Sequence, residues 1–243
     1  MIISSTNELI LNTFTVTSGS VSDGNIGNAR NSNFSKSVSS TSTTFVFTVG
    51  ACDNVDYIAL HGVKLAKDTI VTVSGTGYSD TYTSTGFRNQ NIVFYLPTRK
   101  DFTQLTISIA GIGEKVVSFV QAGSAVEVPW GTNSGQSLYY LGYNTKTRTS
   151  ANENAGPSLR TQRKIAPKLK INIKNVLKSW ARTDFQQILD LYENQGVLSL
   201  IDYQNDDRPD ESVALFDLDS VNVKTHNATT SLVDISFNAR VSV

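Results

Sequence analysis

Between residues 44 and 123, the hydrophobic and polar positions follow the pattern of a succession of short β-strands. In residues 44–49 the alternation places Phe45, Phe47 and Val49 on one face of an extended segment. Five further runs are rich in β-branched and aromatic residues and are closed by turn formers: 55–60, 69–75, 91–96, 104–111 and 115–123. Because no segment of helical periodicity interrupts them, the spacing predicts an antiparallel β-sandwich.

The chain before this region is dominated by small polar side chains. Of residues 1–50, 25 are Ser, Thr or Asn, and only four carry a charge. Short apolar patches formed by Leu9, Leu11, Phe14 and Val16 argue against disorder near the start. We expect residues 19–43 to form a long loop with turns at its glycines, ordered only by packing on its neighbours.

The second half combines further strands with the one helix expected in the chain. Leu169, Ile171 and Ile173 alternate with lysine and asparagine, which predicts a half-exposed strand over residues 168–176. Three more strands are expected at 197–203, 213–224 and 231–243. The pattern is that of a small antiparallel sheet with one helix packed on it, an α+β arrangement.

The helix is expected over residues 183–195. An apolar stripe at helical spacing is formed by Phe185, Ile188, Leu189 and Tyr192. Thr183 and Gln186 have the spacing of a capping box at its start, and Gly196 is a natural stop.

We therefore expect a mainly β protein with two domains. The first, residues 1–128, is the β-sandwich, and the second, residues 158–243, is the antiparallel β domain with its packed helix. Residues 129–157 form the linker and loop between them. Residues 132–137 are turn-rich, and the polar segment 146–158, which ends at the start of the second domain, is read as an exposed loop.

Composition excludes several classes of protein. The 21 basic and 21 acidic residues cancel, which argues against a surface that tracks nucleic acid or an anionic membrane. The single cysteine, Cys52, cannot form an internal disulfide, and zinc sites with four Cys or His ligands are excluded. No signal peptide and no run of 18 apolar residues is recognised, so we expect assembly in a cytosol and no membrane span.

Charge is divided sharply within the second half. Residues 146–182 contain ten basic residues against Glu153 alone, and residues 184–219 contain ten carboxylates against Arg208 alone. One interpretation is that both blocks are solvated faces. The other is that unlike patches of neighbouring copies meet head to tail in a ring. Direct binding of nucleic acid is not expected, because no aromatic stacking platform is interleaved with the basic strand.

On the second interpretation the subunit interface draws on both blocks. Its candidate residues are Arg160, Arg163, Lys168, Lys170, Lys174, Trp180, Asp202, Asp206, Asp207 and Asp210.

No catalytic, metal or cofactor site is predicted. His61 lies within an expected strand, which favours a packed or hydrogen-bonded core histidine over a catalytic base, and His226 lies in an expected turn. Cys52 lacks the surroundings of a nucleophile and is read as a small buried residue. The acidic run at residues 202–211 lacks the EF-hand pattern, which favours a solvated turn over a Ca²⁺ site.

Two stretches resemble parts of phage tail proteins. The first stretch follows a Ser/Thr-rich lead and resembles the galactose-binding-like, discoidin-type jelly rolls found in such proteins. The matching residues are Val55, Asp56, Ile58, Ala59, Leu60, His61 and Gly62. The second stretch resembles the β domain with one helix of distal-tail and tail-tip proteins. The matching residues are Arg160, Arg163, Trp180, Gly196, Asp202, Arg208 and Pro209. In distal-tail proteins the ring-forming domain usually comes first, whereas here the matching domain comes second.

The resemblance implies a virion structural protein of a phage tail, in a distal-tail, tail-tip or adaptor position. It would form a homo-oligomeric ring, such as a hexamer, with other tail proteins as partners, and would assemble in the host cytoplasm. The alternative is a carbohydrate-binding adhesin whose jelly roll contacts host surface glycans. A third possibility is a glycan-cleaving enzyme, which the sequence disfavours because no catalytic constellation is recognised.

Overall fold

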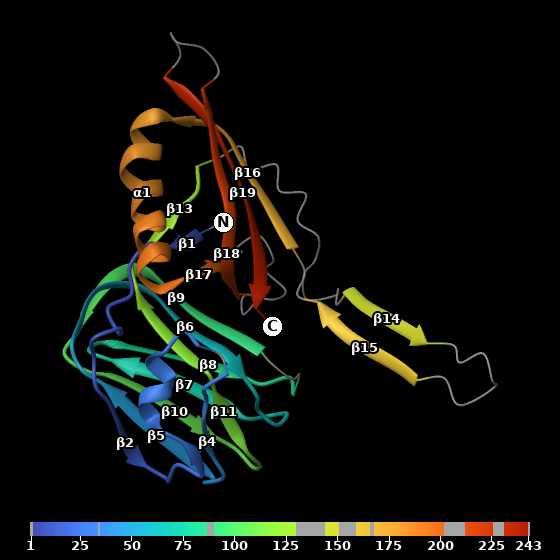
Figure 1. The fold of residues 1–243 in the computed structure, drawn as a ribbon. Helices are drawn as coiled ribbons and strands as arrows, with labels where there is room; N and C mark the ends of the chain where they lie inside the picture. Colours follow the sequence, from blue (N-terminus) through green and yellow to red (C-terminus); the bar gives the residue numbers. More distant parts are fainter. Residues whose placement is uncertain are drawn as a thin grey trace.

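The computed structural model describes residues 2–33, 35–86, 90–129, 144–150, 159–165, 168–201, 212–225 and 231–242. The chain is mainly β, with one α-helix among the described residues. Figure 1 shows two lobes and an arm: a β-sandwich, a β-sheet with the helix on one side, and a two-stranded sheet that stands away from both. The predicted fold class is confirmed.

The β-sandwich is formed by three antiparallel sheets. The largest consists of β2 (Phe14–Ser18), β5 (Thr44–Val49), β10 (Leu105–Ala110), β7 (Ile70–Gly75) and β8 (Tyr78–Thr83). Two three-stranded sheets consist of β12 (Phe119–Gly123), β6 (Cys52–Val63) and β9 (Gln90–Phe102), and of β11 (Lys115–Val117), β4 (Val38–Ser40) and β3 (Asp23–Gly24).

The core of the sandwich follows the predicted alternation. Phe45, Phe47 and Val49 are all buried on the inner face of β5. The ring of Phe47 stacks on that of Phe14 from the neighbouring strand, with 6.0 Å between the ring centres. Burial of these large side chains is the main term that stabilises the lobe.

The second lobe contains a six-stranded sheet that draws on both ends of the chain. Its strands in spatial order are β13 (Ala125–Glu127), β1 (Ile2–Ser4), β17 (Val197–Ile201), β18 (Ser212–Thr225), β19 (Leu232–Ser242) and β16 (Lys168–Leu177). Ile2 pairs with Ile201 and Ile3 with Leu200, so the first residues of the chain lie in the sheet of the second half.

Helix α1 (Lys178–Gln195) packs on one face of this sheet. Phe185 and Ile188 of the helix are buried against Ile173, Ile235 and Phe237 of the sheet. The predicted stripe and the predicted strand at 168–176 are therefore confirmed. Gly196 ends the helix in the left-handed region with φ 67°, as expected for a glycine stop.

The expected start of the helix and its capping box are wrong. The helix begins at Lys178, five residues before Thr183, and its N-cap, Leu177, makes no side-chain capping hydrogen bond. Thr183 instead lies inside the helix, where its single hydroxyl hydrogen has two acceptors within reach, Asp184 Oδ2 at 2.6 Å and the carbonyl of Ser179 at 3.0 Å. The first turn forms because Trp180 and Ala181 pack on the core of the lobe. This tertiary contact cannot be predicted from the residues around the helix start.

Two expected loops contain regular structure. Residues 19–43 include β3, β4 and the 3-10 helix η1 (Ile26–Arg30). Part of 146–158 belongs to β14 (Asn144–Ser150), which pairs along its whole length with β15 (Leu159–Ile165). In both cases the strand depends on a pairing partner elsewhere in the chain. The turn-rich segment predicted at 132–137 lies outside the described residues. No helix in the described part of the chain is long and apolar enough to cross a membrane.

Candidate functional site

The basic half of the predicted interface lies along one continuous stretch of chain. Arg160 and Arg163 belong to β15, and Lys168 and Lys170 to β16, which follows it. Lys174, further along β16, is exposed. The acidic half, Asp202, Asp206, Asp207 and Asp210, lies outside the described residues. The basic candidates are thus divided between the two-stranded sheet, which holds Arg160 and Arg163, and the edge strand of the six-stranded sheet. Their pairing with the acidic candidates stays a prediction.

Strand register brings further basic residues opposite these candidates. Lys146 of β14 pairs with Arg163, and Lys168 pairs with Arg240 of β19. Arg240 is absent from the candidate set because only the pairing of β16 with β19 brings it here. Like charges at directly opposite positions destabilise a sheet.

The lysines of β16 also have a purely structural interpretation. In the described part of the chain, β16 is the outermost strand of the six-stranded sheet. Lysines on an outer strand are a common device that prevents unwanted pairing with another sheet. This role explains lysines in β16 without a partner subunit.

Trp180 serves the core of its own chain. It lies half-buried in the first turn of α1, and its ring centre is 6.2 Å from that of Phe185. Phe185 in turn contacts Phe237 of the sheet, with 6.0 Å between ring centres. The contacts of Trp180 among the described residues account for its size without a partner subunit.

A buried group of hydrogen-bonded polar side chains lies where the two lobes meet. His61 of β6 and Ser199 of β17 are both fully buried, with 2.8 Å between His61 Nε2 and Ser199 Oγ. The Ser199 hydroxyl donates to Gln121 Oε1 at 2.6 Å, and Ser199 N donates to Ser4 Oγ at 2.8 Å. The prediction of a hydrogen-bonded core histidine is confirmed. Sequence reasoning missed Ser199, because nothing local distinguishes it from the other serines.

The pair of His61 and Ser199 does not have the arrangement of a nucleophile and its base. The single hydroxyl hydrogen of Ser199 is directed at Gln121, so His61 Nε2 must carry a proton and donate to Ser199 Oγ. A general base needs that nitrogen unprotonated and facing the nucleophile's hydrogen. Burial, the largest cause, lowers the pKa of His61 to about 4, and both side chains are closed to solvent. The group is a structural link between the lobes.

Cys52 is likewise unsuited to nucleophilic chemistry. It is buried in the sandwich core, as predicted. Burial, with a smaller contribution from Glu8 and Asp53, raises the pKa of its thiol to about 11, which keeps the reactive thiolate scarce near neutral pH. No cluster of three or more potential metal ligands occurs within the described ranges.

A cleft of about 450 Å³ opens on the surface beside the junction of the lobes. It is formed by the loop after β1, by η1 and the turn that follows it, by β12 and by the last turn of α1. The lining residues are Ile10, Leu11, Gly27, Arg30, Asn31, Ser32, Phe119, Asn194 and Gln195. None of the candidates predicted from sequence lines this cleft.

Comparisons with known proteins found resemblance only among solved structures. No family model and no curated protein matches the sequence. The family 32 carbohydrate-binding module of Clostridium perfringens NanJ, solved with galactose, is 12% identical and covers 48% of this chain and 97% of its own, with a TM-score of 0.39. Chitosan-binding module 1 of a chitosanase/glucanase from Paenibacillus sp. IK-5 is 14% identical and covers 49% and 99%, with a TM-score of 0.39.

A Streptococcus pneumoniae fucose-binding module, SpX-3, is 10% identical and covers 49% of this chain and 98% of its own, with a TM-score of 0.34. These similar proteins are carbohydrate-binding modules by their descriptions. A likeness of this degree carries no inference about the ligand or function of the present chain, which must come from its own residues.

Proposed function

We propose that this protein is a structural subunit that assembles with copies of itself, and that the arm formed by β14 and β15 makes the contact. The observation that carries the proposal is the isolation of this arm. All seven register pairs join β14 to β15, and no third strand pairs with either of them in the described part of the chain. Figure 1 shows the arm standing away from both lobes.

An isolated arm of this kind needs a surface to lie on. A two-stranded sheet by itself is only marginally stable in water, and stability usually requires a third strand or a packed partner. The two strands contain five basic residues and no carboxylate: Lys146, Arg148, Arg160, Arg163 and Lys164. The expected partner surface is therefore acidic.

The same chain contains an acidic segment that could supply this partner surface. Residues 184–219 contain ten carboxylates and one arginine, and the whole chain has no net charge. Two different and complementary patches on one subunit produce head-to-tail contacts, which close into a ring when the rotation between copies allows it. A second copy of this chain is thus the partner whose charge fits the arm.

The proposed assembly is a ring in a phage tail, at a distal-tail, tail-tip or adaptor position. The support for this location is the resemblance of residues 160–209 to the helix-bearing β domain of distal-tail proteins. A hexamer is the ring size we expect, with other tail proteins bound above and below.

Light scattering coupled to size-exclusion chromatography tests the assembly with the full chain. We expect a discrete oligomer at 0.1 M salt that loosens at 1 M salt, where the screening length falls to about 3 Å. The double variant R160E/R163E should dissociate the oligomer, whereas K36E/K67E, which reverses two exposed lysines of the sandwich, should leave it intact. Adding D206K/D207K to R160E/R163E should restore it. A strict monomer at high protein concentration would overturn the proposal.

The second candidate function is carbohydrate binding at the cleft beside the lobe junction. The observation that favours it is the lining, in which amide and hydroxyl side chains lie next to exposed apolar ones. Such a mixture suits a ligand that has both hydroxyl groups and a C–H face. A glycan array probed with the full chain tests this function: reproducible binding supports it, and a silent array removes it.

A further inference from the structure

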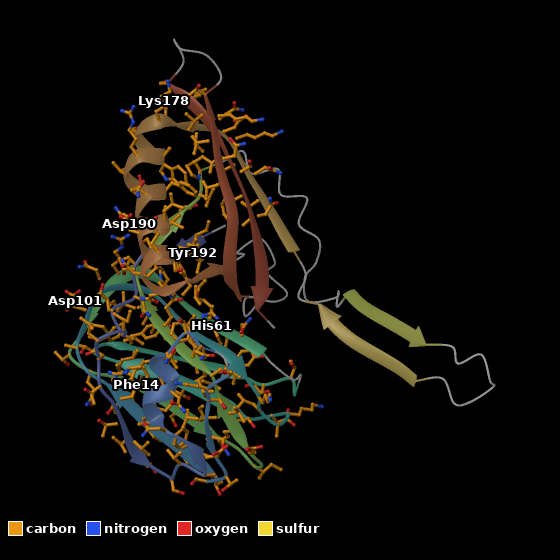
Figure 2. The ribbon with its side chains drawn as sticks, viewed as in Figure 1. Phe14, His61, Asp101, Lys178, Asp190 and Tyr192 are labelled. Carbon is orange, nitrogen blue, oxygen red and sulfur yellow. The ribbon has the colours of Figure 1, made fainter. Side chains whose placement is uncertain are left out.

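The cleft is built by segments that are far apart in the sequence and held together by specific contacts. Figure 2 shows α1 running from Lys178, at the end away from the sandwich, to Tyr192 near the junction of the lobes. Beyond Tyr192, Gln195 Oε1 accepts a hydrogen bond of 2.9 Å from Asn7 Nδ2, which fastens the helix end to the loop after β1. The cleft walls are therefore positioned by the fold.

Arg30 provides the only charge in the lining. Arg30 lies at the end of η1. Its Nη1 donates to the carbonyl of Asn12, in the loop after β1, at 3.3 Å. No carboxylate pairs with Arg30 among the residues that the structure describes. A guanidinium has five N–H donors in a planar fork, so most of this donor capacity remains for a ligand.

The other polar lining residues complement hydroxyl groups. Asn31 Oδ1 accepts from Asn33 N and Gln195 Oε1 accepts from Asn7, which leaves the amide NH₂ groups of these two lining residues as donors for a ligand. Ser32 and Asn194 add a hydroxyl and a third amide to the lining. Hydroxyl-rich ligands satisfy such groups because each hydroxyl both donates and accepts.

An apolar rim completes the cleft. Ile10 and Leu11 are 41% and 90% exposed, which is unusual for large aliphatic side chains in this protein. Phe119 also lines the cleft and is itself buried. The C–H face of a sugar ring would cover Leu11 while its hydroxyl groups meet the amides.

We propose that this cleft binds an acidic saccharide, with the ligand carboxylate on Arg30, its hydroxyl groups on Asn31, Asn194 and Gln195, and its C–H face on Leu11. The paired geometry of guanidinium and carboxylate gives the strongest contact in such a complex. The proposal rests on carbohydrate binding, the second candidate function above, and adds the location of the site and the charge of the ligand.

Two sugars that differ only in the carboxylate provide the test. Titrations of the full chain with methyl β-glucuronide and methyl β-glucoside, followed by calorimetry or ligand-observed NMR, should give a Kd on the order of 1 mM for the glucuronide. The glucoside should bind at least about 10-fold more weakly, because the charge-assisted contact is lost. Inorganic phosphate should not compete at equal concentration, and competition would show a plain anion site and overturn the proposal.

Variants locate the site. R30Q should abolish the preference for the glucuronide, R30K should retain part of it, and L11A or N194A should weaken both sugars. The exposed K67Q is the matched control and should bind as the parent chain does. If acidic glycans bind on the array but R30Q binds them unchanged, the site is wrong while carbohydrate binding stands. If no acidic or neutral glycan binds, carbohydrate binding itself is wrong.

Discussion

His61 Nε2 lies 2.8 Å from Ser199 Oγ although the two residues are 138 positions apart, and this hydrogen bond ties the sandwich to the six-stranded sheet. Ser199 also bonds Gln121 and Ser4, so one buried serine connects β6, β12, β1 and β17. Such a network stabilises a junction only when its members are satisfied together, because an unpaired buried polar group is costly. Gln121 Nε2 is buried without a hydrogen-bond partner among the described residues, so the network links the lobes without being fully satisfied.

The His61 link predicts loss of stability in mild acid. Burial lowers the pKa of His61 from 6.5 to about 4. Between these values the unfolded chain binds a proton that the folded chain does not, so the free energy of unfolding falls as the pH decreases from 6.5 toward 4. It is constant with respect to this group above and below that window. The loss should be on the order of 3 kcal/mol.

Urea unfolding at several pH values from 7.5 to 4 checks this expectation. Subtracting the curve of H61Q from that of the parent chain isolates the contribution of His61, and the difference should decrease toward acid pH. H226Q, which changes the only other histidine, should keep the parent slope. An identical slope in H61Q and the parent would show that His61 is not the responsible group.

Replacing Ser199 by alanine should destabilise the lobe junction. S199A removes the acceptor for His61 and the donor for Gln121, and both partners remain fully buried. Each unsatisfied buried group costs about 1–3 kcal/mol, so we expect a loss within or above this range. Thermal and urea unfolding measure it, with S179A on the exposed side of α1 as the control that should change little.

Lys115 should stabilise the turns at one end of the sandwich. Its side chain is only 1% exposed, and Nζ donates to the carbonyls of Ser42, Gly111 and Gly113 at 2.8, 2.7 and 3.0 Å. K115M keeps the aliphatic stem but leaves these carbonyls without their donor, which should cost about 1–3 kcal/mol of unfolding free energy. Exposed Lys64 on the neighbouring bridge offers the matched variant K64M, which should stay within about 0.5 kcal/mol of the parent.

The helix start at Lys178 determines what is expected of substitutions at Thr183 and at Leu177. Thr183 lies within α1, so T183A should leave the free energy of unfolding unchanged or raise it slightly, since alanine has the higher helix propensity. At the true N-cap, L177D supplies the acceptor that Leu177 lacks and should add about 0.5–1 kcal/mol. Urea unfolding measures both variants. If T183A lost about 1 kcal/mol of unfolding free energy, Thr183 would be the N-cap of the capping box that the sequence predicts.

Local periodicity explains which parts of the fold could be predicted. The alternation in residues 44–49 and the apolar stripe of the helix show directly which residues face the core. Phe45, Phe47, Phe185 and Ile188 are accordingly buried. Strands such as β3, β4 and β14 were missed, because they are short or polar and owe their existence to a partner strand. The helix start was misplaced for the same reason: Trp180 packs on a core that the local sequence does not show.

The sequence by itself determined the mainly β class, most strands of the sandwich, the helix with its glycine stop, and the separation of basic and acidic blocks. All of these depend on residue type and on its order along the chain. Only the tertiary structure decided that β1 joins the sheet of the second half, that Ser199 meets His61, and that Asn7 and Gln195 hold a cleft together. Such pairings are selected by the packing of the whole chain, since a hydrogen bond between distant residues leaves no periodic trace in either segment.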